Sequence, residues 1–218
     1  MNFKAFLFDC DGTIINTDRL IMNAWRAATD FMLPGKPVNE QDLRKHFGRT
    51  FDEAAMLLAQ EFGVDDYNPE EVAEVYWTYH KGHPEDIDGV FPTVAEALKS
   101  LKAKGIPMGI VTSGFYETCS KELEELGVRE FFDVIVGAGD VTQPKPNAQP
   151  ALICCERLGV EPKEALLIGD SKNDIACGNN AGCTTAIVSW SLCNINNLQG
   201  VEKPDMVISD AKQLLEYI

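Results

Sequence analysis

Two aspartates lie close together near the start of the chain, where Asp9 and Asp11 belong to the sequence Asp-Cys-Asp-Gly-Thr. The apolar residues 4–8 before them are typical of a buried strand, and open α/β sheets bind ligands at the carboxyl ends of their strands. Carboxylates two residues apart on an extended segment share one face. At about 4 Å and an effective dielectric constant of about 20, their repulsion is about 4 kcal/mol. The pair therefore needs a retained proton or a cation between its members.

A hydroxyl group and an ammonium group follow two later apolar segments. The tripeptide Thr112–Gly114 comes directly after residues 106–111 and offers a hydroxyl and backbone N–H groups at a helix start, an arrangement that binds anions. Lys145, with a proline on each side, follows the next apolar segment. Either feature alone has a simpler explanation, because a Thr-Ser pair is usually a helix cap and a Lys-Pro pair is usually a solvated turn.

A second pair of carboxylates, Asp170 and Asp174, follows the apolar residues 165–168. Such a pair at the start of a helix is often only a capping arrangement. The order of the features is more informative than any one of them, because each follows an expected strand. Parallel strands bring their carboxyl ends to the same edge of a sheet. The combination therefore predicts that all of these side chains belong to one site.

Short apolar segments bounded by Gly, Pro or Asp alternate with segments that have helical spacing. Apolar runs of this length are typical of strands buried in a parallel sheet. Their alternation with helices over short connections predicts an α/β fold with a doubly wound parallel sheet. The expected strands are 4–8, 106–111, 133–136, 165–168, 184–188 and 206–208. The expected helices are 93–105, which Thr93 would cap, 115–126, 147–158, 172–180 and 210–217.

The segment 16–88 interrupts this alternation. It contains helical patterns separated by Gly and Pro residues, and no convincing strand. An all-helical insertion after the first strand is the simplest explanation. We therefore expect a core domain of residues 1–15 and 89–218 and an α-helical cap domain of residues 16–88. The expected cap helices are about 18–32, 39–47, 52–62 and 69–81. The side chains expected in the cap interior are Trp25, Phe31, Leu33, Met56, Leu57 and Phe62.

The charge balance limits the possible partners. The 218 residues include 19 Lys and Arg against 34 Asp and Glu, which gives a formal net charge of −15. Such a charge repels nucleic acids and anionic lipid surfaces, so neither is an expected partner. No apolar run approaches the roughly 20 residues that span a bilayer, and the first residues lack the apolar stretch of a signal peptide. Seven cysteines, an odd number without a metal-binding spacing, indicate reduced thiols in a cytoplasmic protein.

The four motifs together resemble those of the haloacid-dehalogenase-like hydrolase superfamily. The resemblance covers essentially the whole chain and is closest to the phosphoglycolate-phosphatase-like and β-phosphoglucomutase-like branch. It implies a Rossmann-like core, a mobile helical cap, and a Mg²⁺-dependent phosphatase that acts through an aspartyl phosphate on a small phosphorylated metabolite, such as phosphoglycolate or a sugar phosphate. We expect a monomer or a homodimer. The motifs are Asp9-x-Asp11-Gly12-Thr13, Thr112-Ser113, Lys145-Pro146 and Gly169-Asp170-Ser171-x-x-Asp174.

The resemblance also implies a role for each motif residue. Asp9 would be the nucleophile that attacks phosphorus, and Asp11 would be the general acid for the leaving group and then the base for the hydrolytic water. Lys145 would neutralise both the nucleophile and the phosphate. Cys10, between the two aspartates, alternates away from their face and is expected to pack in the core. The groups expected to bind the phosphoryl oxygens are Thr112, Ser113, Gly114 and Lys145.

A metal site is implied in the same way. Asp170 would supply a side-chain ligand to Mg²⁺, and Asp174 would bind or orient the ligand shell. The Asp9 carboxylate and the Asp11 carbonyl would complete it. The charge count supports a cation independently, because four carboxylates and a dianionic phosphate would face one obvious lysine. Ligands that are all oxygen favour Mg²⁺ over zinc.

Two other functions stay open on the sequence. A sugar-phosphate mutase of the β-phosphoglucomutase type would share the core and the cap, but such mutases usually carry His in the first cap helix, where this chain has Ile21. A non-catalytic phosphate-binding regulatory protein would be expected to have lost the nucleophile or the metal aspartate, and both are present. The residues Ser113-Gly114-Phe115 also depart from the amide and Lys that often follow the motif-two Thr in phosphoglycolate phosphatases. The motifs thus leave the substrate open.

Arg49 lies between two expected cap helices, where caps of this family commonly place a substrate-specificity loop. Arg49 would there bind an anionic part of the substrate, and the alternative is an exposed arginine without such a role. In the first case we expect Arg49→Ala to raise KM for some substrates, because their anionic part would lose its counter-charge. Hydrolysis of p-nitrophenyl phosphate should stay nearly unchanged, since its leaving group has no anionic part for Arg49 to bind. Steady-state kinetics with both substrates measure the difference. Equal losses on all substrates would indicate a folding defect and contradict the assignment.

Overall fold

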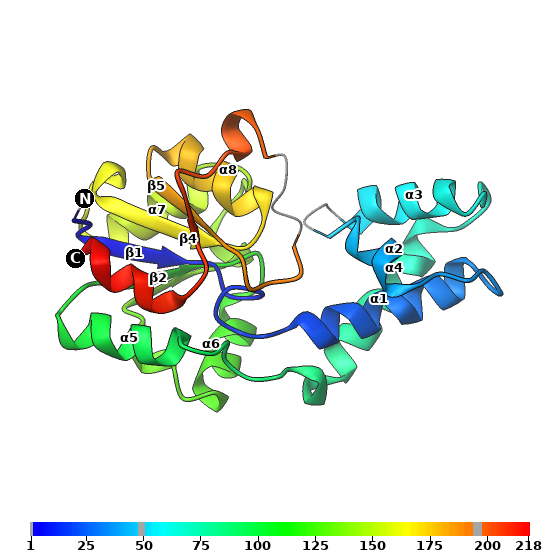
Figure 1. Cartoon of the computed structure of the whole chain (residues 1–218), viewed down its shortest axis with the longest axis horizontal. Helices are drawn as coiled ribbons and strands as arrows, with labels where there is room; N and C mark the ends of the chain where they lie inside the picture. Colours follow the sequence, from blue (N-terminus) through cyan, green and yellow to red (C-terminus); the bar gives the residue numbers. More distant parts are fainter. Residues whose placement is uncertain (1, 48–50, 194–197) are drawn as a thin grey trace. The chain divides into compact units, whose positions relative to one another are not determined.

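A parallel sheet forms the centre of the larger part of the chain in the computed structural model, which describes residues 2–47, 51–193 and 198–218. The sheet has six strands in the order β3-β2-β1-β4-β5-β6, and all neighbouring strands are parallel (Figure 1). The expected doubly wound α/β fold is confirmed. The strands are β1 (Ala5–Phe8), β2 (Met108–Val111), β3 (Val134–Val136), β4 (Ala165–Gly169), β5 (Thr184–Val188) and β6 (Met206–Ile208).

The strand order determines where a ligand can bind. From β1 the chain moves outward to β2 and β3, and it then returns to the other side of β1 to form β4. The strand order thus reverses between β1 and β4, and open α/β sheets bind ligands at the carboxyl ends of strands at such a point. In the register, Phe8 pairs with Ile168, so the two strands end side by side. All residues of β1 and β4 are buried, as expected for strands covered on both faces.

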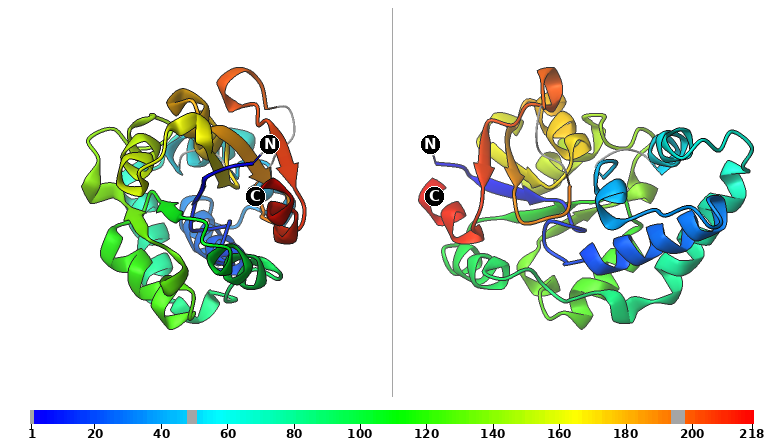
Figure 2. Two further views of the ribbon diagram at one scale, coloured as in Figure 1. Left: turned by 90° about the vertical axis from the view of Figure 1, so that its left-hand side faces the viewer. Right: turned by 45° about the vertical axis from the view of Figure 1, so that its right-hand side comes forward.

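Helices cover the two faces of the sheet (Figure 2). On one face, α7 (Gln149–Leu158) and α8 (Lys172–Ala181) contribute apolar side chains to a core cluster that includes Leu7 and Leu167. On the other face, α5 (Val94–Ala103) and the final 3₁₀ helix η6 (Ala211–Tyr217) line a small cavity together with Phe8. Helix α6 (Tyr116–Glu125) follows β2. The short 3₁₀ helices are η1 (Pro84–Asp86), η2 (Arg129–Phe131), η3 (Ala138–Asp140), η4 (Pro162–Glu164) and η5 (Gly200–Glu202).

One local expectation for the core was confirmed and one was wrong. The final segment, expected as a helix over 210–217, is helical over Ala211–Tyr217, in the 3₁₀ form of η6. Thr93 precedes α5 as expected, but its side chain makes no capping hydrogen bond, and its backbone is left-handed with φ of 68°. The side chain of Thr93 instead helps to lower the pKa of Asp210, a residue far from it in the sequence.

The described residues divide into two compact units. The core unit comprises residues 2–16, 89–191 and 198–218, and the cap unit comprises residues 17–88 together with Leu192 and Cys193. No described residue of the cap unit belongs to a sheet strand. Local sequence signals start two of its helices, because Asn39 caps α2 in a capping box and Asn68 caps α4 ahead of Pro69. The helices are α1 (Asp18–Met32), α2 (Glu40–Arg44), α3 (Phe51–Glu61) and α4 (Pro69–Gly82).

The interior of the cap unit is an apolar cluster between α1, α3 and α4. Trp25 and Leu33 are buried in it, as expected, whereas Phe31 and Met56 are 50% and 44% exposed. Those two expectations were wrong, because helical periodicity turns both residues away from the buried faces of α1 and α3. Ile21, at the position where mutases carry His, is partly buried against this cluster.

All seven cysteines are free thiols, and six of them are buried. Cys193 is partly exposed. Among the described residues, no helix is both long enough and apolar enough to cross a membrane.

Candidate active site

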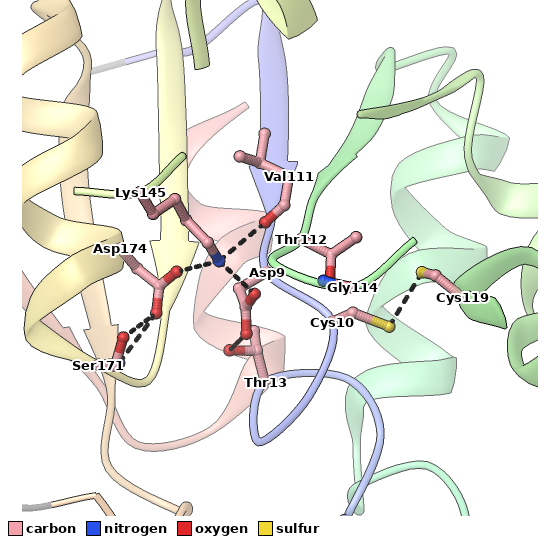
Figure 3. Close-up of polar contacts among 10 residues, drawn as sticks. All are labelled: Asp9, Cys10, Thr13, Val111, Thr112, Gly114, Cys119, Lys145, Ser171 and Asp174. Atoms are coloured by element: carbon pink, nitrogen blue, oxygen red, sulfur yellow. Dashed lines mark hydrogen bonds and ion pairs between the residues drawn. The ribbon is translucent and has the colours of Figure 1, made fainter. Parts of the chain in front are cut away.

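Asp9 lies directly beyond the end of β1 at the centre of the sheet. Its backbone N–H donates to the carbonyl of Ile168 over 2.8 Å, which continues the pairing with β4 and fixes the direction of the side chain. Only 6% of Asp9 is exposed. One carboxylate oxygen, Oδ1, accepts from Lys145 Nζ at 2.6 Å, and Oδ2 lies 3.4 Å from the Thr13 hydroxyl (Figure 3). The expected nucleophile is therefore held in one orientation.

Lys145 joins three separate segments of the chain through its ammonium group. Nζ lies 2.6 Å from Asp9 Oδ1, 2.6 Å from Asp174 Oδ1 and 3.1 Å from the Val111 carbonyl oxygen. An ammonium group has three protons, so each has an acceptor. Burial lowers the pKa of Lys145, but the two carboxylates outweigh it and raise the pKa above its ordinary value. Lys145 is thus a permanent cation in the middle of the site (Figure 3).

Asp174 is fixed by the first turn of α8. Its Oδ2 accepts from the backbone N–H of Ser171 at 3.0 Å and from the Ser171 hydroxyl at 2.6 Å, which forms a capping box. A side chain at Gly169 would collide with Asp174, so glycine is needed where the strand turns into this helix. The helix cap therefore aims the other oxygen of Asp174 at Lys145.

Asp170 is positioned by residues outside the four motifs. Its Oδ2 accepts from the Ser191 hydroxyl at 2.6 Å. Gly12 has φ of 73°, and a Cβ there would collide with the Asp170 carboxylate, so only glycine fits. Next to Ser191, Trp190 Nε1 donates to the carbonyl of Thr13 over 3.2 Å. The loop after β5 thus holds both the metal aspartate and the Asp-Cys-Asp-Gly-Thr segment, and no motif in the sequence indicated this role.

Three carboxylates meet at the expected metal position. Oxygens of Asp9, Asp170 and Asp174 lie within 4.8 Å of one another, and all three residues are buried. Burial, followed by the charge of Asp174, raises the pKa of Asp9 well above its ordinary value, despite the opposing effect of Lys145. One lysine leaves the three carboxylates with excess negative charge. A hard divalent cation would balance that charge, and an all-oxygen donor set fits Mg²⁺.

The segment after β2 contains the expected phosphate-binding groups. Thr112 is buried, and its N–H donates to Val136 O at 3.0 Å, whereas the side chain of Ser113 is exposed. Thr112 Oγ1 accepts from the N–H of Gly114 at 3.0 Å. The N–H of Gly114 thus stabilises the turn, and the expected part of Gly114 in phosphate binding stays a prediction. Helix α6 begins only at Tyr116, so this turn lies between the expected phosphate-binding residues and the helix.

Asp11 lies near a carboxylate that the motifs do not predict. It is partly exposed and forms a backbone bridge with Ile15. Glu122 on α6 is half-buried, and burial followed by the charge of Asp11 raises the pKa of Glu122 to about 7. The Asp11 carboxylate is therefore close enough to α6 to act on Glu122 electrostatically.

Comparison with known proteins identifies the family. A sequence model described as haloacid dehalogenase-like hydrolase matches residues 6–188, a span that contains all four motifs. The chain belongs to the haloacid dehalogenase-like hydrolases. The resemblance found in the motifs is therefore confirmed. Buried aspartates in a cluster such as Asp9, Asp170 and Asp174 are typical of the metal site in these hydrolases.

Similarity to individual proteins of the family extends over the whole chain. Pyrophosphatase PpaX of Bacillus velezensis is 32% identical over 211 residues, which cover 97% of this chain and 94% of that protein. Pyrophosphatase PpaX of Halalkalibacterium halodurans is 32% identical over 221 residues, covering 100% and 98%. A solved hydrolase of the family, SP0104 from Streptococcus pneumoniae, superposes with a TM-score of 0.80 at 22% identity and covers 99% of this chain and 98% of its own. That structure supports the fold alone.

The structure brings together most of the residues expected to form the site. Asp9, Lys145, Asp170 and Asp174 lie within one buried cluster, and Thr112 follows the adjacent strand. Arg49 lies outside the described residues, so its role stays a prediction. The chain is a phosphatase of the haloacid dehalogenase-like family with an acidic metal site.

Removal of the Ser191 hydroxyl should weaken metal binding. In Ser191→Ala, Asp170 loses the 2.6 Å hydrogen bond that orients it. Partners of this kind typically change metal affinity by about 10- to 100-fold. We expect the Kd for Mg²⁺, measured by calorimetric titration, to rise by about that factor, with a smaller Mg²⁺-induced increase in Tm. Ser100→Ala, on the exposed face of α5, is the matched control. An unchanged Kd in Ser191→Ala would contradict the positioning role.

Proposed function

We propose that this chain hydrolyses phosphate esters or anhydrides through a covalent aspartyl phosphate on Asp9, with Mg²⁺ as cofactor. The observation that carries the proposal is the buried Lys145 ammonium group, 2.6 Å from both Asp9 and Asp174. It offsets part of the negative charge that an anionic phosphoryl group would meet on approaching Asp9. The position at the ends of β1 and β4 supports the same conclusion.

The reaction would proceed in two displacements. An Asp9 oxygen bonds to phosphorus while the bond to the leaving oxygen breaks, and Asp11 donates a proton to that oxygen. Asp11 then takes a proton from a water molecule that attacks the phosphorus of the aspartyl phosphate. This second step releases inorganic phosphate and restores Asp9.

The remaining residues would hold the phosphoryl group and the cation. The Thr112 hydroxyl, the Ser113 N–H and Lys145 would bind phosphoryl oxygens. Asp170 and Asp9 would ligate Mg²⁺ with side-chain oxygens and Asp11 with its carbonyl, while Asp174 orients the shell. When bound, Mg²⁺ supplies the positive charge that lets an anionic nucleophile approach a phosphate dianion.

We infer that inorganic pyrophosphate is the substrate. The support is the 32% identity over the full chain to proteins named pyrophosphatase PpaX. The sequence after Thr112 points in the same direction, because Ser113-Gly114-Phe115 lacks the amide and Lys often found in phosphoglycolate phosphatases. A β-phosphoglucomutase-like activity has less support, since Ile21 packs in the cap interior at the position of the mutase His. Phosphoglycolate and sugar phosphates are the alternative substrates.

A substrate panel tests this inference. We expect kcat/KM for pyrophosphate to exceed that for phosphoglycolate and glucose 1-phosphate by at least about tenfold, a difference of about 1.4 kcal/mol in transition-state stabilisation. Phosphate release measures hydrolysis, and a coupled assay for glucose 6-phosphate measures mutase activity. Omission of Mg²⁺ should abolish turnover of every substrate. Preferred hydrolysis of phosphoglycolate would contradict the pyrophosphate assignment and favour a phosphoglycolate phosphatase. Formation of glucose 6-phosphate would favour a sugar-phosphate mutase.

Substitutions of Asp9 and Asp11 test the covalent mechanism. Asp9→Asn keeps the shape but removes the nucleophilic oxygen, so no phosphoenzyme should form. Asp11→Asn keeps the backbone carbonyl but cannot transfer a proton, and it should lower kcat by about 10²- to 10⁴-fold. In Asp11→Asn, the rate of aspartyl phosphate formation should fall less with p-nitrophenyl phosphate, because its leaving group needs little protonation.

The readout is trapping of a phosphate mimic. Beryllium fluoride with Mg²⁺ should bind wild-type protein and Asp11→Asn but not Asp9→Asn, as seen by ¹⁹F NMR. Mass spectrometry must first exclude deamidation of the introduced amide back to a carboxylate in the Asp9→Asn preparation. Substantial turnover by verified Asp9→Asn would overturn the covalent mechanism.

A further inference from the structure

Cys10 lies between the expected nucleophile and the expected general acid, and its sulfur contacts a second thiol. Cys10 Sγ is 3.3 Å from Cys119 Sγ on α6 (Figure 3). Cys10 is fully buried and Cys119 is 3% exposed. The sequence predicted that Cys10 packs in the core, which the structure confirms, but 109 residues separate it from the thiol that it contacts.

We propose that Cys10 and Cys119 are a modification site, at which peroxide forms a reversible disulfide that displaces the catalytic segment and stops phosphoryl transfer. The effect on activity rests on the proposed function of Asp9 and Asp11, whereas formation of the disulfide does not. The sulfurs need to approach by little more than about 1 Å, because a disulfide bond is about 2.05 Å long.

The chemistry requires one peroxide molecule for each disulfide. One thiol is oxidised by hydrogen peroxide to a sulfenic acid, with release of one water molecule. The second thiol attacks the sulfenic sulfur, the S–S bond forms, and a second water molecule leaves. The two sulfurs lose two electrons in total, and the peroxide gains them. A dithiol reductant reverses the reaction by thiol–disulfide exchange.

The contacts of Cys10 explain why the disulfide would act on catalysis. Its carbonyl accepts from the N–H groups of Ile14 and Ile15 at 2.9 and 3.0 Å, so it closes the turn that follows Asp9. The adjacent Asp9 carboxylate depends on a 2.6 Å contact with Lys145. Displacement of reacting groups by about 1 Å can lower a rate by about 100-fold. A bond between the segment after β1 and α6 would shift both catalytic aspartates together.

Burial of the pair selects the oxidant. Neither sulfur is accessible to a bulky disulfide such as oxidised glutathione, whereas peroxide is about the size of a water pair and can enter during local opening. Two other buried cysteines, Cys155 and Cys183, lie together in the core cluster that α7 and α8 form with the sheet. They belong to no catalytic motif, so they provide an internal comparison. Cys193 is the cysteine that is not buried.

The test uses the full chain with Cys193→Ser, which removes the partly exposed thiol and prevents cross-linking between molecules. The protein is treated with hydrogen peroxide, quenched by alkylation and digested without reduction. Mass spectrometry should detect a peptide linked through Cys10 and Cys119. Hydrolysis of p-nitrophenyl phosphate should fall by about 100-fold and recover after dithiothreitol. Oxidised glutathione should produce neither change.

Two further variants separate this pair from the other thiols. Cys119→Ser, with Cys119→Ala as an alternative if the first is unstable, should keep its basal activity and retain it in peroxide. Cys183→Ser should still form the Cys10–Cys119 link and lose activity like the parent. Absence of the linked peptide, or equal inactivation of Cys119→Ser, would overturn the modification site. A linked protein that stays active would overturn only the effect on catalysis. If p-nitrophenyl phosphate is not hydrolysed at all, the proposed function fails while the linked peptide still tests the site.

Discussion

The ammonium group of Lys145 is the contact on which the site depends. It touches Asp9 after β1, Asp174 on α8 and the last carbonyl of β2, so one buried charge connects three separate segments. Removing one partner of a buried ion pair typically destabilises a protein by about 3–5 kcal/mol, because the other charge stays unpaired. The carboxylates of the site also outnumber this one ammonium group. The folded site therefore carries excess negative charge, which a bound divalent cation would balance.

The sheet topology makes this contact possible. Because β1 and β4 are neighbours at the point where the strand order reverses, residues about 160 positions apart meet at one edge. Small residues then permit the close approach. Gly12 lies against Asp170, and Gly169 lies against Asp174, in places where a Cβ would collide with a carboxylate. The glycines of the motifs are therefore explained by the packing of the carboxylates as much as by the turns themselves.

Site residues could be predicted from the sequence where their type and their place after an expected strand indicated their chemistry. Asp9, Lys145, Asp170 and Asp174 could be predicted because each follows an apolar strand, and parallel strands share an edge. Ser191, Glu122 and Cys119 could not, because each acts through a contact that only the tertiary structure creates. The same limit explains the wrong expectations for Phe31 and Met56, where hydrophobicity predicted burial but helical phase exposes both side chains.

Cys10 shows how packing and chemistry constrain the same position differently. Core packing requires a small buried side chain between Asp9 and Asp11, and alanine or valine would also be apolar enough for that position. A thiol there adds reactivity, and α6 places a second thiol against it at 3.3 Å. Peroxide chemistry at such a pair acts on the backbone that carries the nucleophile, without needing access to the phosphate site. Cys10 is buried because it packs in the core, but its oxidation would affect catalysis.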